Sequence, residues 1–176
     1  NFHARFSALN RTYRYLISDA KTSSALLHDQ ITWSSRPLDI EKMREGAAYL
    51  VGRNDFTSFR ATQCQAKSPV REIQYLHIIR RGDLIVLEVQ ANAFLHHMVR
   101  NIVGVLLSVA AGDKPADWVG EVLAAKNRSA GGVTSKPYGL YLVSVDFPAD
   151  FKLPKGVPGP LFLPEPVGGF AAELGS

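Results

Sequence analysis

Residues 94–104, FLHHMVRNIVG, place one arginine inside an apolar run that is typical of a buried helix. Arg100 keeps its charge at any ordinary pH, so a guanidinium packed into a core requires a carboxylate or a phosphate as its partner. A surface helix whose arginine extends into water would explain the same pattern. On a helix, Arg100 would lie near His96, His97 and Gly104, and the glycine favours the close approach of another backbone. The sequence therefore raises the question of which group pairs with Arg100.

The adjacent histidines invite comparison with a metal site. Neighbouring helical residues point about 100° apart, and no further His or Cys follows at the spacing of metal ligands. We therefore expect His96 and His97 to form hydrogen bonds with nearby groups, and we expect no metal site.

Two other segments have the composition of a binding surface. The N-terminal run FHARFSALNRTYRYL mixes cations that bind phosphate with rings that stack on bases: Arg5, Arg11, Arg14, Phe2, Phe6, Tyr13 and Tyr15. A half-buried strand, with its aromatic rings in the core and its arginines in solvent, would explain this composition equally well. The polar loop NDFTSFRATQCQAKSP, residues 54–69, is longer than a plain connection requires, which is typical of binding loops as well as of mobile surface loops.

Regular elements that could position these residues follow from the hydrophobic pattern. Alternating and β-rich runs predict strands over residues 6–18, 71–80, 84–90 and 140–147. The second and third should form a hairpin, and the last should be buried. Helical spacing predicts helices over residues 38–51, 95–111 and 115–125. This order indicates an α+β domain over residues 1–147, ferredoxin-like or RRM-like, with helices on one face of a largely antiparallel sheet. Residues 148–176 are rich in proline and are predicted to form an extended tail.

Composition narrows the class of protein. The chain has 176 residues, 46% of them hydrophobic, and its 20 Lys and Arg outnumber its 16 Asp and Glu, which favours a polyanionic partner. Cys64 is the only cysteine, so no intrachain disulfide can form, and a reducing cytoplasm fits best. The longest apolar run is too short to span a membrane, and we expect a soluble protein. The start at Asn1 without Met suggests a chain that lacks its beginning.

Four segments in this order, FHARFSA, RTYRYLI, NDFTSFRA with QCQ, and NAFLHHMVRNIVG, resemble the TruA-type tRNA pseudouridine synthases. The resemblance extends over about residues 2–163. It implies an enzyme that converts uridines in the anticodon arm of tRNA to pseudouridine, by cutting the base from its ribose, turning it and rejoining it through carbon, without cofactor or metal. It also implies two α+β halves around a basic cleft, a homodimer and a cytoplasmic location. This chain resembles the second half with the strand that precedes it.

The resemblance assigns a partner to Arg100, the catalytic aspartate, which would face it across the cleft. In the family that aspartate lies in a first-half segment, Gly-Arg-Thr-Asp-Ala-Gly-Val-His, and this chain contains no such segment. The nearest similar run, residues 52–55, continues differently, so Asp55 is not expected to be the nucleophile. The chain alone is therefore expected to be inactive.

Tyr13 matches a family tyrosine whose ring lies against the target uracil and whose hydroxyl is a candidate for the final proton transfer. By the same resemblance, the RNA-binding residues are expected to be Phe2, His3, Ala4, Arg5, Phe6, Lys21, Gln63, Cys64, Gln65, Ala66 and Lys67. The composition of the N-terminal run adds Arg14 to this expected surface. Two alternatives without chemistry remain: an RNA-binding module and a dimerisation fragment.

Overall fold

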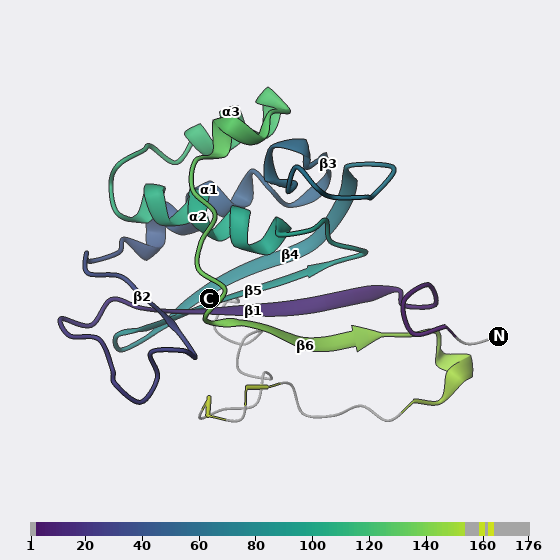
Figure 1. Ribbon diagram of the computed structural model, residues 1–176, viewed down its shortest axis with the longest axis horizontal. Coiled ribbons are helices and arrows are strands. Elements are labelled where there is room, and N and C mark those ends of the chain that lie inside the picture. Colours follow the sequence, from purple (N-terminus) through teal and green to yellow (C-terminus); the bar gives the residue numbers. More distant parts are fainter. Residues whose placement is uncertain (1–2, 154–158, 161, 164–176) are drawn as a thin grey trace.

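The computed structural model describes residues 3–153, 159–160 and 162–163 as a six-stranded sheet with its helices on one face (Figure 1). The strands run in the order β2-β1-β5-β4-β3, and β6 pairs with β1 as well. Their bounds are β1 Asn10–Ser18, β2 Thr32–Trp33, β3 Gly52–Asp55, β4 Val70–Arg81, β5 Leu84–Ala91 and β6 Leu140–Asp146. All pairs are antiparallel except β1 with β2. The predicted α+β class is therefore confirmed.

The hairpin of β4 and β5 has the short turn that the sequence predicted. Arg81 pairs with Leu84, which leaves Gly82 and Asp83 as the connection. Gly82 has φ of 59°, a conformation that glycine adopts without steric cost.

Three helices, α1 Ile40–Ala48, α2 Met98–Ala110 and α3 Trp118–Ala125, form the second layer. Asp39 caps α1, because its carboxylate accepts hydrogen bonds from the backbone N–H groups of Glu41 and Lys42. The main core lies between these helices and the sheet, and its fully buried members include Met43, Phe56, Leu87, Ile102 and Val119. Among the described residues, no helix is long and apolar enough to cross a membrane.

The structure differs from the predicted elements in several places. Strands β2 and β3 were not predicted, and β6 is half-exposed although its sequence predicted a buried strand. Helix α2 begins at Met98, three residues later than expected, since His97 has φ of 60° in the left-handed region. The predicted tail lies mostly outside the described residues, although residues 149–151 form a short 3-10 turn.

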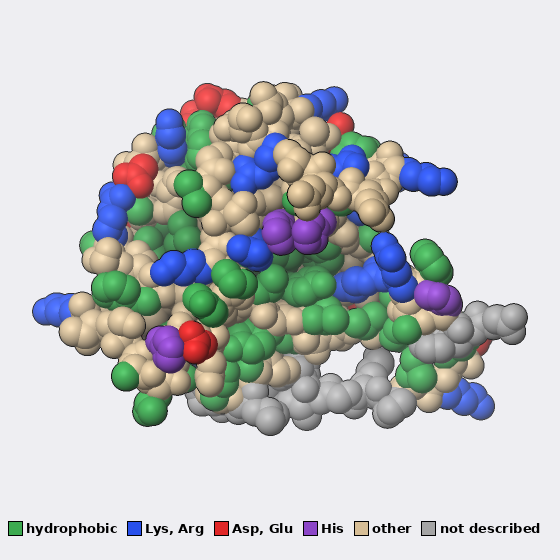
Figure 2. Space-filling view, viewed as in Figure 1, with side chains coloured by type: hydrophobic (Ala, Val, Ile, Leu, Met, Phe, Trp, Pro, Cys, Tyr) green, Lys and Arg blue, Asp and Glu red, His purple; other side chains and the backbone are tan. Residues whose placement is uncertain are grey.

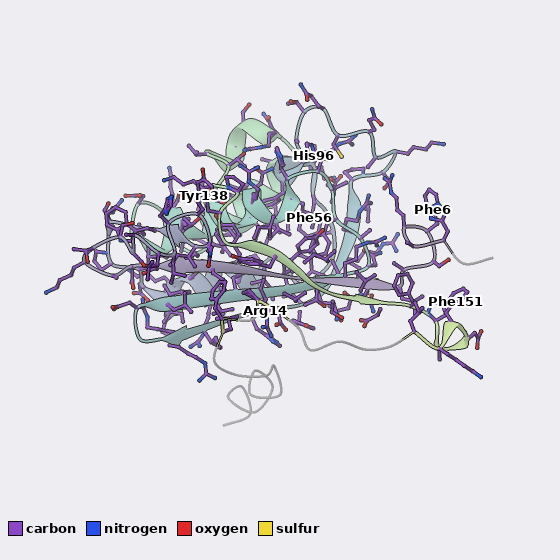
Figure 3. All side chains as sticks on the ribbon, turned by 60° about the horizontal axis from the view of Figure 1, so that its bottom comes forward. Phe6, Arg14, Phe56, His96, Tyr138 and Phe151 are labelled. Carbon is purple, nitrogen blue, oxygen red and sulfur yellow. The ribbon has the colours of Figure 1, made fainter. Side chains whose placement is uncertain are left out.

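The opposite face of the sheet carries a smaller apolar cluster, Leu16, Ile31, Ile79 and Val86. Beside it a buried ion pair joins neighbouring strands: Arg14 Nε donates to Glu88 Oε2 over 2.7 Å. In Figure 3, Arg14 lies on the side of the sheet away from Phe56 and His96. Side chains alternate along β1, so Tyr13 and Arg14 lie on different faces of the sheet.

Candidate functional site

A cavity of about 1030 Å³ opens between the helix layer and the N-terminal half of β1. Its walls come from the N-terminal turn, from β1, from residues 63–66, and from the β5–α2 connection with the first turn of α2. The lining contains four arginines and no Asp or Glu: Arg5, Arg11, Arg71 and Arg100. Figure 2 shows His, Lys and Arg side chains around hydrophobic surface on this face, with the acidic side chains in view lying elsewhere. The site is therefore suited to an anion.

Arg100 reaches the cavity from the first turn of α2, and its guanidinium is held at one edge. Nε donates to the Ser135 carbonyl over 2.9 Å, and Nη1 lies 3.3 Å from His97 Nε2. Among the described residues, no Asp or Glu forms an ion pair with Arg100. The guanidinium thus retains donors for an acidic group that enters the cavity.

Residues 132–135 run alongside α2 and bind the backbone of Arg100. Ser135 donates to the Arg100 carbonyl through its N–H at 3.2 Å and through its hydroxyl at 2.9 Å. The segment comes this close because Gly104 lacks a side chain: a Cβ there would overlap the Val133 carbonyl oxygen. The expected close approach of another backbone at Gly104 is confirmed.

The two histidines precede α2, so the prediction that they lie on the helix is wrong. Their rings stack with centroids 3.9 Å apart, an arrangement that the left-handed backbone of His97 makes possible. Burial lowers the pKa of His97, and the charges of His96, Arg100 and Arg128 lower it further. A neutral His97 can accept a hydrogen bond from Arg100 Nη1, and it therefore helps to orient the guanidinium. No cluster of metal-binding side chains occurs among the described residues.

Tyr13 is half-buried in the cavity wall, and its ring meets Phe94 edge-on with centroids 4.9 Å apart and planes at 82°. Burial raises the pKa of Tyr13, while the charge of Arg11 partly offsets the rise. The hydroxyl is therefore protonated at neutral pH. A ring supported in this way offers a stacking surface and a hydroxyl that can donate or relay a proton.

The loop after η1 (Thr57–Phe59) is fixed by Arg60, which belongs to the polar run of residues 54–69. Arg60 Nη2 donates to the carbonyls of Cys64 and Ala66 over 2.7 and 2.8 Å. Cys64 Sγ accepts from the His96 N–H at 3.5 Å, which joins the loop to the β5–α2 connection. Burial alone would raise the pKa of the Cys64 thiol, but the N–H groups of Ala66 and His96 and the Arg60 charge lower it overall.

The cavity brings together most of the residues predicted to form the site. These are Arg5, Phe6, Tyr13, Gln63, Cys64, Gln65, Ala66 and Arg100. Four further predicted residues are exposed but do not line it: His3, Ala4, Lys21 and Lys67. Phe2 lies outside the described residues.

Arg14 requires a correction. Its side chain is 1% exposed and is paired with Glu88, and its Nη1 donates to the Gly159 carbonyl over 2.9 Å on the opposite face of the sheet. A phosphate could reach this guanidinium only after the ion pair had broken, so Arg14 is not part of the RNA-binding surface considered below.

Several lining residues were not predicted as site residues, among them Arg11, Arg71 and Phe94. Arg11 lies on the same face of β1 as Tyr13, and this alternation could have identified it. Its Nη2 donates to the Arg5 carbonyl over 2.6 Å and its Nη1 to the Asn92 carbonyl over 3.1 Å, which joins the N-terminal turn to the β5–α2 connection. Phe94 and Arg71 have no comparable signal in the sequence, because their positions depend on how the strands assemble.

A helix-covered antiparallel sheet with a basic cavity and an aromatic ring in its wall has the features of a nucleic-acid-binding α+β domain. Residues 47–148 match the family described as tRNA pseudouridine synthase. Proteins named tRNA pseudouridine synthase A are similar to most of the chain: that of Pseudomonas aeruginosa is 56% identical over 93% of the chain, and that of Nitrosococcus oceani 54% over 88%. The chain belongs to the tRNA pseudouridine synthase family. It covers 57% and 60% of the lengths of these two relatives.

Proposed function

We propose that this chain forms one wall of the catalytic cleft of an enzyme that isomerises uridine to pseudouridine in the anticodon arm of tRNA. The observation that carries the proposal is the convergence of Arg100 and Tyr13 on one basic cavity whose lining contains no acidic residue. The nucleophilic aspartate would come from a segment outside this chain. The greater length of the relatives leaves room for such a segment.

Arg100 would hold that aspartate ionised and in a fixed orientation. A guanidinium next to a carboxylate lowers the pKa of the carboxylate and can bind both of its oxygens at once. Because the Ser135 carbonyl already accepts from Nε, the plane of the guanidinium is set before the carboxylate arrives. The oriented carboxylate could then attack or deprotonate the sugar.

Tyr13 would support the uracil after it leaves the helical stack. Extruding a base costs a few kcal/mol, and an aromatic contact worth about 1–3 kcal/mol can offset much of that cost. The protonated hydroxyl could relay a proton away from the rearranged base if it passes its own proton to another acceptor.

The N-terminal turn and residues 63–66 would contact the tRNA around the target nucleotide. The Phe6 side chain is 77% exposed, and the Arg5 guanidinium lies 5.7 Å from the centre of its ring. An exposed ring beside a cation suits a nucleotide, which offers a base and a phosphate together. The exposed Lys21 and Lys67 would add phosphate contacts outside the cavity. A homodimer in the cytoplasm, as the resemblance implies, completes the proposal.

The test compares the purified chain with the complete enzyme in a pseudouridine assay on tRNA. We expect the chain alone to form no pseudouridine and the complete enzyme to form it. In the complete enzyme, Arg100→Lys should slow single-turnover isomerisation far more than it weakens tRNA binding, since Lys keeps the charge but loses the bidentate geometry. Turnover by the chain alone, or equal losses of rate and affinity, would contradict the proposal. In the first case Asp55 would be the first residue to substitute.

A further inference from the structure

We infer that Arg128 is a positioning residue for the reaction: it fastens residues 132–135 to helix α2 and so holds the Arg100 guanidinium in its working orientation. The inference rests on the proposed function, since it assumes that Arg100 acts in catalysis. Arg128 does not line the cavity, and it would act only through the groups that it binds.

Arg128, in the 3-10 turn η2 (Arg128–Gly131), donates hydrogen bonds from its guanidinium to one backbone carbonyl and two side chains. Nη1 donates to the Gly132 carbonyl over 2.9 Å. Nη2 donates to Thr134 Oγ1 over 2.7 Å and to Asn101 Oδ1 over 3.0 Å. All three acceptors are neutral, and among the described residues no carboxylate forms an ion pair with Arg128. The arrangement uses the planar fork of arginine, which a lysine ammonium cannot reproduce.

Thr134 and Asn101 close a small hydrogen-bonded ring with Arg128. The Thr134 hydroxyl accepts from Arg128 and donates to Asn101 Oδ1 over 2.6 Å. Asn101 is buried, and its Nδ2 donates to the Phe59 carbonyl over 2.8 Å. The ring therefore connects residues 132–134 to a side chain of α2 that is itself fixed in the core.

Two members of this hydrogen-bonded ring are next in sequence to Arg100 and Ser135. Asn101 follows Arg100 in α2, and Thr134 precedes Ser135, whose carbonyl accepts from Arg100 Nε and whose N–H and hydroxyl donate to the Arg100 carbonyl. Movement of the 132–135 segment would therefore move the acceptor that sets the plane of the guanidinium. A misplacement of about 1 Å can reduce a rate by about 100-fold without removing any group that touches the substrate.

The experiment uses the complete enzyme and measures the single-turnover rate and the tRNA dissociation constant separately. We expect Arg128→Lys and Arg128→Gln to lower the rate by about 10- to 100-fold while the dissociation constant changes by less than about 3-fold. Thr134→Val should lower the rate, and Thr134→Ser, which keeps the hydroxyl, should restore it. The matched control is Arg36→Gln, since this 53% exposed arginine also makes three hydrogen bonds, to Asp113 and the Ala111 carbonyl, without lining the cavity.

A double-substitution cycle separates positioning from general destabilisation. In an Arg100→Lys background, Arg128→Gln should lower the single-turnover rate by less than about a further 3-fold. The orientation that Arg128 protects is already lost in that background. Native rates for the Arg128 and Thr134 variants would overturn the inference, and so would losses that multiply in full with that of Arg100→Lys. A native rate for Arg100→Lys alone would overturn the proposed function and this inference with it. The two failures are therefore distinguished by different variants.

Discussion

Gly104→Ala is the substitution that most directly tests how the site is held together. A Cβ at this position would overlap the carbonyl oxygen of Val133 and lie 3.3 Å from the backbone nitrogen of Ser135. Both obstacles are backbone atoms, so they cannot turn aside as the end of a flexible side chain can. We expect the 132–135 segment to be pushed away from α2, which separates the Arg100 Nε from the Ser135 carbonyl.

The expected cost to stability is smaller than the expected cost to activity. Alanine favours the helix by about 1 kcal/mol over glycine, whereas overpacking costs about 1–3 kcal/mol. The net loss in the free energy of unfolding is then at most about 2 kcal/mol. A hydrogen bond to a charged group stabilises by about 1.5–3 kcal/mol. If the transition state loses that much stabilisation, the rate falls by about 10- to 150-fold.

The assay pairs urea unfolding of the variant with single-turnover isomerisation by the complete enzyme. Gly120→Ala is the control, because its Cβ would come closest to the ring of Tyr49, which is 47% exposed and can move aside. We expect the control to keep its rate and Gly104→Ala to lose it while remaining folded. A folded Gly104→Ala enzyme with the native rate would refute the view that the contact with residues 132–135 orients Arg100.

Four other predictions test separate parts of the fold and the site. Tyr13→Phe should bind tRNA with native affinity but stall after the glycosidic bond breaks, whereas Tyr13→Leu should also bind more weakly, by about 1–3 kcal/mol; native product formation by the Phe variant would remove the proton-transfer role. Glu88→Gln should lower the free energy of unfolding by about 3–5 kcal/mol in urea titrations, because it removes the carboxylate charge that the buried Arg14 guanidinium binds. The lowered pKa of His97 means that protonation favours the unfolded chain, so stability should fall as the pH drops below about 6.5, and His97→Gln should flatten this part of the curve. Arg5→Gln should reduce the logarithmic salt slope of tRNA binding by about 0.7–0.9, and an unchanged slope would exclude a phosphate contact.

Elements that bury a periodic face were predictable from the sequence. The β4–β5 hairpin and helix α1 follow from alternation, a glycine turn and an acidic N-cap, and each signal is local. Strand β2 has two residues and β3 has four, too few to show alternation, and they exist as strands because β1 and β4 offer edges to pair with. The start of α2 depended on the left-handed backbone of His97, which apolar spacing does not encode.

Site residues were predictable where the chemistry of one residue conflicts with its surroundings. Arg100 was identified because a charge interrupts an apolar run, and Gly104 because a glycine stands in a helix. Arg14 was misplaced because composition groups it with Arg5 and Arg11, although alternation along β1 already separates it from Tyr13. Deciding between those signals required the strand register, which places Arg14 opposite Glu88. Registers of this kind depend on residues far apart in the chain, and a local pattern cannot supply them.

The partners of the arginines divide the molecule into two electrostatic regions. Away from the cavity, arginines pair with carboxylates: Arg14 with Glu88, Arg36 with Asp113, Arg44 with Glu41 and Arg80 with Asp19. In and around the cavity, guanidinium groups donate instead to neutral acceptors, most of them backbone carbonyls, as in Arg11, Arg60, Arg71, Arg100 and Arg128. A carbonyl fixes a guanidinium without neutralising it, so this region keeps its positive charge while its geometry is set. The cleft that we propose would attract a polyanion and orient a single carboxylate, and it would need both properties. Because no described carboxylate neutralises Arg100, we place its partner in another segment.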